Sequence, residues 1–392
     1  MNVERHNSTS ISHPHLSPNM RITRLQGQPP HGVHRLPPAL LSSIFIECAV
    51  EWQDESEYRF QRSAPHWVNV SYVCRYWRTT ALHCPQLWSY HFFTSVEWTN
   101  ELLARSEPAP LDIRFDLCRL TEDIIMAGHL SVGFVLLHMS RIRVLWMRCA
   151  TTHAFSFSPY LRLRAPLLES FHFEICPCSK DDVLIDREVF GKVRSNNLRH
   201  VHLDGCAVQL SSPIFHGLTR LSLYNTPRSH PRPTIVEALS VLQQMPDLQT
   251  LKLHHALSDE NNMNGASSVF LPKLASVSLA GNIHCIIDLL SYLLFPQCTR
   301  INIEYDWLDD THVPRLRSFI LSRCDTDFGL EPRHLEILVT VHSDVALLRV
   351  SCPSALESMD ASVFRLCNDA PDLVLPLQVV VSFQNAHTCN IH

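Results

Sequence analysis

Residues 198–226 read LRHVHLDGCAVQLSSPIFHGLTRLSLYNT, and one short pattern occurs in them twice. The first copy consists of Leu198, Val201 and Leu203, and the second copy begins at Leu218. Each copy has the form apolar-x-x-apolar-x-apolar, so its last two apolar residues are two positions apart. That spacing places them on one face of a short β-strand. The stretch therefore predicts two buried strands joined by a connection of about ten to fifteen residues.

The same pattern occurs elsewhere in the chain, which indicates a repeat. Its copies are Ile142/Leu145/Met147, Leu168/Phe171/Phe173, Leu198/Val201/Leu203, Leu218/Leu221/Leu223, Leu248/Leu251/Leu253, Leu274/Val277/Leu279 and, more weakly, Cys298/Ile301/Ile303. Starts of successive copies are separated by 20 residues (Leu198 to Leu218) to 30 residues (Leu168 to Leu198). This period is typical of units that contribute one strand each to a parallel sheet and return through a helix or loop. We expect the last leucines of four copies to lie in register, namely Leu203, Leu223, Leu253 and Leu279.

Two of the segments between the strands have helical periodicity. Residues 234–244 place Ile235, Leu239 and Leu242 on one helical face, and residues 283–295 read as an almost continuously apolar helix. Each segment stops at a proline, Pro246 or Pro296. The position three residues after a strand is Cys206, Thr226, Ala256 or Asn282, so the turns are expected to be irregular. Residues 376–383 are expected to form a last edge strand or part of a cap.

Residues 33–93 have a different, helical pattern. Pro37 stands near the start of a first helix, which places five apolar residues on one face: Leu40, Leu41, Ile44, Phe45 and Cys48. Residues 51–65 are polar and are expected to form a loop. A second helix is expected from the spacing of Val70, Val73, Cys74, Trp77 and Ala81. Pro85 ends it, so Leu87 and Trp88 are expected to be exposed or covered by a partner.

Composition limits the classes of partner. The formal net charge is -5 and no basic stripe is present, so nucleic acid is not an expected partner. The longest apolar stretch, 283–295, is interrupted by His284 and Asp288 and is shorter than the roughly 20 residues of a membrane span. Residues 1–32 are polar and are expected to form a disordered tail. The 14 cysteines are scattered, which favours reduced thiols in the cytoplasm and/or nucleus.

Local signatures of enzymes are absent from the sequence. None of the 10 glycines forms Gly-x-Gly, and no phosphate-binding loop, Gly-x-Ser-x-Gly or His-Glu-x-x-His motif occurs. His172, Cys176 and Cys178 offer possible metal ligands, but no second pair of ligands accompanies them. We therefore expect no catalytic, cofactor-binding or metal-binding residues and no enzymatic activity. Catalytic groups assembled from distant positions stay an alternative.

Two runs, LPPALLSSIFIECAV (36–50) and WVNVSYVCRYWRTTALHCPQLWSY (67–90), together resemble an F-box. The resemblance rests on the order of a Leu-Pro that opens a helix, a Val-Cys-x-x-Trp core and a trailing Pro-x-Leu-Trp. The whole chain resembles F-box proteins with divergent leucine-rich repeats. Two features depart from that family: the loop 51–65 is longer than in a compact F-box, and Thr226 and Ala256 stand where the repeats favour Cys or Asn.

The resemblance implies an α/β chain with a disordered tail (1–32), an F-box-like helical domain (33–93) and an irregular leucine-rich-repeat solenoid (94–392). The solenoid would be a curved parallel sheet with helices and loops on its outer side. The F-box would bind a Skp-type adaptor and, through it, a cullin, while the repeats bind an unknown protein substrate. The residues carried over as adaptor-binding are Leu36, Pro37, Leu40, Leu41, Ile44, Phe45, Val73, Cys74, Trp77, Leu87 and Trp88.

That division of labour predicts a non-catalytic substrate-recognition subunit of an SCF-type ubiquitin ligase. Two alternatives stay open. In the first, the apolar residues of 33–93 merely form the core of a small helical domain. In the second, the chain is a leucine-rich-repeat protein-interaction scaffold without a ubiquitin role.

Overall fold

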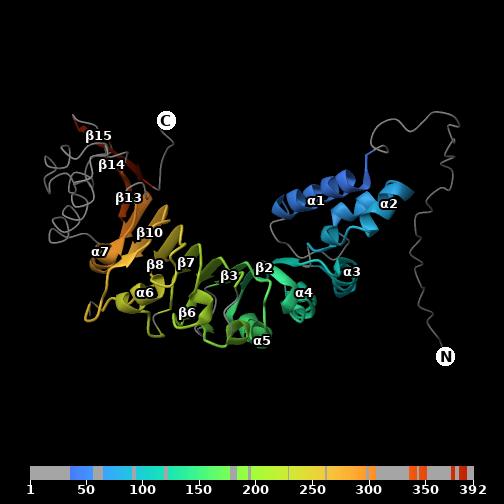
Figure 1. Ribbon diagram of the computed structural model, residues 1–392, viewed down its shortest axis with the longest axis horizontal. Coiled ribbons are helices and arrows are strands. Elements are labelled where there is room, and N and C mark those ends of the chain that lie inside the picture. The colour runs from blue at the N-terminus through green and yellow to red at the C-terminus, as the bar shows by residue number, and fades with distance from the viewer. Residues whose placement is uncertain are drawn as a thin grey trace, which may run out of the picture.

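The computed structural model describes residues 36–55, 65–90, 94–118, 122–176, 183–192, 196–227, 229–260, 263–296, 300–305, 335–341, 344–350, 372–375 and 379–385. The predicted tail 1–32, Cys178 and Cys298 lie outside these residues. Helices gather at the N-terminal end, and a long sheet follows along the chain (Figure 1). The hydrophobic core runs without interruption from Leu41 in the first helix to Ile303 in the sheet.

The N-terminal helices are α1 (Pro38–Glu55), η2 (His66–Tyr72), α2 (Arg75–Leu82), η3 (Pro85–Trp88) and α3 (Val96–Ser106). The first predicted helix is confirmed, but it continues to Glu55, so the expectation of a loop from residue 51 is wrong for residues 51–55. The expected continuous second helix is also wrong. Cys74 has an extended backbone, with φ -158° and ψ 172°, and it separates the 3-10 helix η2 from α2.

Leu87 and Trp88 are not exposed, contrary to the sequence-based expectation. Both side chains have 0% exposure. Helix α3 packs against η3, and the Arg105 guanidinium lies 4.2 Å from the centre of the Trp88 ring. The Trp88 indole N–H donates a hydrogen bond of 2.7 Å to the Ala81 carbonyl, which satisfies its one polar atom inside the core. Residues after the predicted helices therefore cover this part of the core, without any partner chain.

The central sheet has 12 strands. Their order across the sheet is β1 (Leu111–Asp116), β2 (Ile142–Cys149), β3 (Ser170–Ile175), β5 (His200–Asp204), β7 (Arg220–Tyr224), β8 (Thr250–His254), β10 (Ser276–Gly281), β12 (Arg300–Tyr305), β13 (Leu335–Val341), β14 (Asp344–Val350), β16 (Val379–Asn385) and β15 (Asp372–Leu375). Neighbours from β1 to β13 are parallel, and the remaining pairs are antiparallel.

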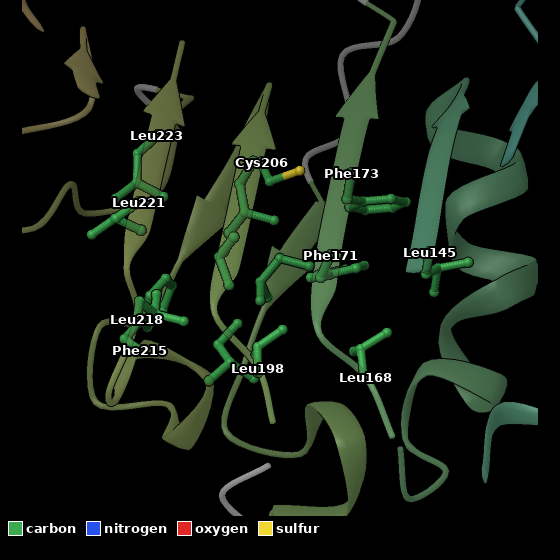
Figure 2. Packing of buried hydrophobic residues seen from close by; sticks show 14 of the residues in the cluster. Leu145, Leu168, Phe171, Phe173, Leu198, Cys206, Phe215, Leu218, Leu221 and Leu223 are labelled. Carbon is green, nitrogen blue, oxygen red and sulfur yellow. The ribbon is translucent and has the colours of Figure 1, made fainter. Parts of the chain in front are cut away.

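The predicted register is confirmed. Leu203 pairs with Leu223, Leu223 with Leu253, and Leu253 with Leu279 in successive parallel strands. Each of the four is at most 5% exposed. Figure 2 shows the reason on β3 and β7: the three apolar positions of each copy follow one another along the strand, and Leu168 and Leu218, like Leu198 of the copy between them, lie below the strands. Apolar side chains therefore stack across the sheet and exclude water from one of its faces.

The segments between the strands cover that face. They include α4 (Glu122–Leu136), η4 (Met139–Arg141), α5 (Thr151–Leu161), β4 (Val183–Ile185), η5 (Val189–Lys192), β6 (Cys206–Val208), η6 (Pro213–Phe215), α6 (Ile235–Leu242), β9 (Val269–Phe270), α7 (Ile283–Tyr292) and β11 (Leu293–Leu294). Both predicted return helices, α6 and α7, are confirmed, but α7 ends at Tyr292, so the expectation of helix as far as residue 295 is wrong for Leu293–Leu294, which form β11. A capping box between Thr234 and Glu237 starts α6, and the Asn282 side chain accepts from the His284 N–H at the start of α7.

Several strands of the sheet were not predicted. Strand β1 precedes the first repeat copy, and its apolar residues Leu111, Ile113 and Phe115 alternate without the preceding apolar position. Strands β13, β14 and β15 were not predicted either. The last strand expected at residues 376–383 is found as β16, of which residues 379–383 are part, but β16 lies between β14 and β15 instead of at the edge. The α/β class with a mostly parallel sheet is confirmed. The described residues do not show the expected solenoid, and the F-box and leucine-rich-repeat assignments stay predictions.

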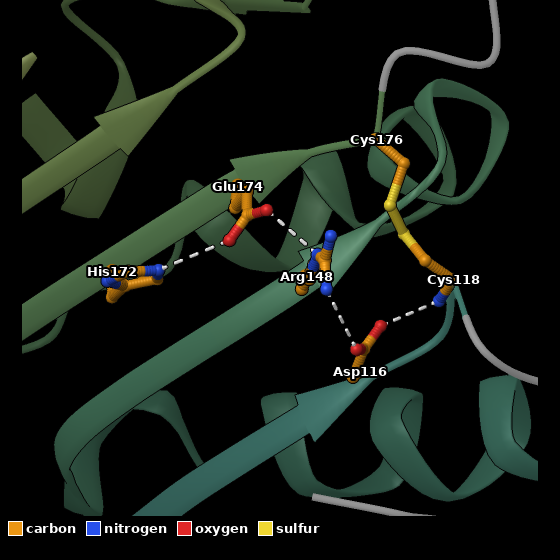
Figure 3. Close-up of a disulfide and its surroundings, with 6 residues drawn as sticks. All are labelled: Asp116, Cys118, Arg148, His172, Glu174 and Cys176. Atoms are coloured by element: carbon orange, nitrogen blue, oxygen red, sulfur yellow. Dashed lines mark hydrogen bonds and ion pairs between the residues drawn. A yellow bond between two sulfur atoms is a disulfide. The ribbon is translucent and has the colours of Figure 1, made fainter. Parts of the chain in front are cut away.

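One cysteine pair corrects the expectation of reduced thiols. Cys118, just after β1, forms a disulfide with Cys176, just after β3, while six other described cysteines are free (Figure 3). Strand β2 lies between β1 and β3, so the disulfide spans three strand ends. In the part of the chain that the structure describes, no helix is both long and apolar enough to cross a bilayer.

Candidate functional site: an apolar surface on the first helix

Helix α1 has two apolar faces, of which only one is buried. Leu41, Phe45 and Ala49 recur every four residues and are 0%, 1% and 0% exposed. Leu40 and Ile44 recur with the same spacing, one residue earlier, and are 55% and 45% exposed. Residues four apart lie on one side of a helix, so the two sets form adjacent stripes. We call the exposed stripe, Leu40, Ile44 and the exposed Cys48, the α1 surface.

Contacts on the buried side fix the orientation of α1. The Phe45 ring packs against the Trp77 ring of α2, with 5.1 Å between centroids. At the start of the helix, the Tyr76 hydroxyl donates a hydrogen bond of 2.7 Å to the Leu36 carbonyl. The α1 surface is therefore carried by a helix that is held at its start and near its middle.

The break at Cys74 creates a second exposed apolar group. The Cys74 sulfur accepts a weak hydrogen bond of 3.4 Å from the Trp77 N–H, so Cys74 acts as the N-cap of α2. The turn in front of it leaves Tyr72 63% and Val73 57% exposed. The Arg78 guanidinium lies 5.6 Å from the Tyr72 ring centre and donates to the Ser71 carbonyl, which holds this turn in place.

The structure separates the eleven predicted adaptor-binding residues into three groups. Exposed are Pro37, Leu40, Ile44 and Val73; partly buried are Leu36, Cys74 and Trp77; buried in the core are Leu41, Phe45, Leu87 and Trp88. Side chains of the last group cannot touch a partner in this conformation, because the protein itself covers them. Any direct contact falls to the first group, with support from the second.

Tyr72 and Leu82 are exposed apolar residues that the sequence reasoning missed, and Leu82 is 44% exposed. Tyr72 was passed over because a continuous helix was expected there. The signal for the break is the Cys-x-x-Trp spacing, since a cysteine can cap the helix that follows it.

The chemistry available at the α1 surface is apolar contact. Its exposed neighbours on the same helix are Ser43, Glu47 and Glu51, so an apolar stripe is bordered by acidic residues. Large aliphatic and aromatic side chains on a firmly held helix are typical anchors of protein interfaces. The arrangement suits binding to an apolar groove or helix of another protein.

The described residues offer little to catalysis or metal binding. No group of three or more His, Cys, Asp and Glu among them is arranged to hold a metal ion. A cleft of about 330 Å³ at the start of α7 contains Cys285, Arg232 and His255. Burial, followed by the charges of Asp259 and Asp288, raises the pKa of Cys285 to about 11, so the thiol stays protonated at neutral pH. A protonated thiol is a poor nucleophile.

Comparisons with models of protein families, with curated proteins and with solved structures find no match to this chain.

Proposed function

We propose that this chain is a non-catalytic substrate-recognition subunit of an SCF-type ubiquitin ligase. In this proposal residues 33–93 are an F-box-like module that binds a Skp-type adaptor and, through it, a cullin. The repeated strands that follow are a divergent leucine-rich-repeat array that binds a protein client.

The observation that carries the proposal is the pair of stripes on α1. One stripe packs into the core. In the other stripe, Leu40 and Ile44 are about half exposed and lie beside acidic residues. A helix that serves only its own core needs a single apolar stripe, so the second stripe favours a partner. The F-box resemblance supplies a partner of the right kind, because its Leu-Pro start falls at this helix.

The sheet supports the second half of the proposal. Strands β2, β3, β5, β7, β8, β10 and β12 follow one another in chain order, and each carries one copy of the apolar pattern. Repeat arrays of this kind present one extended face on which side chains vary without disturbing the core. Such a face is suited to holding a client protein.

The proposed mechanism is proximity. Holding a client on the sheet and the ligase on α1 raises the effective concentration of client lysines near the ubiquitin donor. No step of bond making is assigned to this chain.

The test is direct binding of purified components. Intact protein is mixed with a purified Skp-type adaptor and passed over a size-exclusion column, and then the complex is mixed with a cullin. We expect all three chains to elute together. If the adaptor elutes alone at micromolar concentrations, the ubiquitin role is wrong and the alternative of a plain repeat scaffold replaces it.

A further inference from the structure

The second face of the parallel sheet is polar, and its charges are distributed unevenly. Along β3, β5 and β8, residues with buried side chains alternate with partly exposed ones. The partly exposed residues of neighbouring strands form rows across the sheet. One row, near the starts of the strands, runs through His200, Arg220, Thr250, Ser276 and Arg300. The next row contains His172, His202, Ser222, Lys252, Ser278 and Asn302.

On β1 to β3 the charges of this face are paired within the protein. The Arg143 guanidinium donates to both carboxylate oxygens of Asp112, at 3.0 and 2.6 Å. Arg148 lies between Asp116 and Glu174, with ion pairs of 3.4 and 2.8 Å (Figure 3). This half of the face therefore has compensated charges and little need for an external ion.

On β7 to β12 three cations have no such partners. Among the described residues, none forms a hydrogen bond or ion pair with the charged group of Arg220, Lys252 or Arg300, and Arg220 and Arg300 are exposed. Between them lie four small hydroxyl residues, of which Thr250 and Ser276 are partly exposed and Ser222 and Ser278 are buried. We call these seven residues the cationic patch.

Three histidines beside the patch, His200, His202 and His254, have lowered pKa values, which favours their neutral forms. The pKa of His202 is lowered to about 4, first by burial, then by the neighbouring His172, with Lys252 acting in the same direction and Glu174 against it. The pKa of His254 is also about 4, from burial, His255 and Lys252. For His200 the pKa is lowered by burial and then by Arg220, against Glu169. Arg220 and Lys252 therefore lower the pKa values of the histidines next to them.

On β5 to β12 the acidic groups of this face lie in a separate row near the ends of the strands. Asp204 is the one on β5, and it accepts a hydrogen bond of 2.9 Å from the Asn225 side chain; Glu304 is the one on β12. Measured along the strands, this acidic row is at least two residues beyond the cationic patch. At about 3.3 Å per residue, that separation is at least about 7 Å. The face is therefore polarised, with its uncompensated positive charge toward the strand starts.

The ring arrangement disfavours nucleic acid as the occupant. The His172 and His202 rings stack on each other, with 3.9 Å between centroids and 5° between planes, and Trp146 stacks on His172 from the other side. Both faces of the His172 ring are thus covered, and bases need open faces to stack on. The net charge of -5 also gives no long-range attraction for a polyanion.

We propose that the cationic patch binds an acidic segment of a protein, with anionic side chains placed against Arg220, Lys252 and Arg300. Arg220 and Arg300 lie in one row, three strand spacings or about 14 Å apart. Acidic residues four positions apart in an extended chain are separated by about 13 Å, which matches that distance. The inference rests on the proposed function, and it names the class of client that the sheet would hold.

The probe is a fluorescein-labelled 12-residue peptide with glutamate at every fourth position and Ser, Ala and Gly elsewhere, titrated with the intact protein and followed by anisotropy. A second peptide carries phosphoserine in place of glutamate, because carboxylate and phosphate are both anionic side chains. A third peptide carries lysine. The triple variant Arg220→Gln/Lys252→Gln/Arg300→Gln removes the charges. The control is Lys273→Gln, because Lys273 is an exposed lysine that is not part of the patch and is paired with Asp247.

We expect a glutamate or phosphoserine peptide to bind in the micromolar range, with at least tenfold loss in the triple variant and less than twofold loss in Lys273→Gln. The stronger of the two peptides identifies the source of the anionic group. Binding of neither peptide at millimolar protein, equal binding of the lysine peptide, or equal loss in both variants would overturn the inference. So would tighter binding of a 12-residue single-stranded oligonucleotide.

Adaptor binding measured on the same samples separates this inference from the proposed function. The triple variant leaves the α1 surface intact, so it should still bind the adaptor, and that binding also shows that it is folded. If the wild-type protein binds the adaptor but not the peptides, the inference about the cationic patch is wrong. If the wild-type protein does not bind the adaptor, the proposed function is wrong.

Discussion

Leu40 and Leu41 are adjacent in α1, yet Leu40 exposes 55% of its surface and Leu41 exposes none. The 100° rotation between neighbouring helical residues places them on different stripes. Leu41 belongs to a core that continues into the sheet, whereas Leu40 faces outward with Ile44. The same helix therefore has a structural side and a side available for binding.

This difference predicts opposite effects of two chemically identical substitutions. Leu41→Ala should lower the free energy of unfolding by roughly 2 to 5 kcal/mol, because it leaves a cavity in the core. Leu40→Ala should change it by less than about 0.5 kcal/mol. Urea unfolding followed by circular dichroism measures both values. Similar losses for the two variants would contradict the assignment of the two stripes.

The register of the leucines makes a second prediction. Leu253 is 5% exposed and lies between Leu223 and Leu279 in neighbouring strands, so Leu253→Ala should cost roughly 2 to 5 kcal/mol of stability. Leu137→Ala is the matched control, because Leu137 is 59% exposed. A loss at Leu253 no larger than at Leu137 would mean that the repeated leucines do not form the core.

The repeats were predictable because their signal is local and recurs. In the triplets that begin at Leu198 and Leu218, the last two apolar residues are two positions apart, which is the period of a strand. A strand with this pattern buries one face wherever it lies in the fold. Strand β1 was missed because Leu111, Ile113 and Phe115 lack the apolar residue that opens each other copy. The antiparallel strand β14 was missed because no repeat marks it.

The candidate site was only partly predictable, since burial depends on distant segments. Nothing near Trp88 indicates that Arg105, from a later helix, will cover its ring. Helical spacing groups Leu40 with Leu41 and Ile44 with Phe45, and only the packing of Trp77 against Phe45 decides which of them face inward. The disulfide joins Cys118 to a residue 58 positions later, so sequence spacing could not identify it.

Stability should depend on pH through His202. Its ordinary pKa is 6.5 and its pKa in the folded protein is about 4, because burial and the facing His172 and Lys252 outweigh Glu174. Between these values the unfolded chain binds a proton that the folded protein does not, so stability falls as pH falls from about 6.5 to about 4. His202→Phe keeps a ring against His172 but does not titrate.

The measurement is the urea midpoint of both proteins across that pH range. The slope should be smaller in His202→Phe, although His254, whose pKa is lowered in the same direction, preserves part of it. Equal slopes in the two proteins would show that His202 titrates normally.

Reduction should weaken the fold near the first three strands. The Cys118–Cys176 disulfide closes a loop with a sequence separation of 58, for which the chain-entropy model gives roughly 4 kcal/mol of stabilisation. Unfolding with and without a phosphine reductant measures the difference. Cys118→Ser should be less stable than the oxidised protein and insensitive to the reductant. A reductant effect that persists in Cys118→Ser would assign the effect to other cysteines.

The most direct test of the account is calorimetric titration of a Skp-type adaptor into the intact protein and into Leu40→Asp/Ile44→Asp. Burying two unpaired carboxylates at an apolar interface should weaken binding by roughly 2 to 5 kcal/mol, or at least about thirtyfold. The matched control is Met126→Asp/Leu130→Asp, which changes exposed apolar residues of α4 in the same way and should bind within about threefold of the wild-type protein. Unchanged affinity in a folded Leu40→Asp/Ile44→Asp protein would contradict the proposal that α1 binds the adaptor.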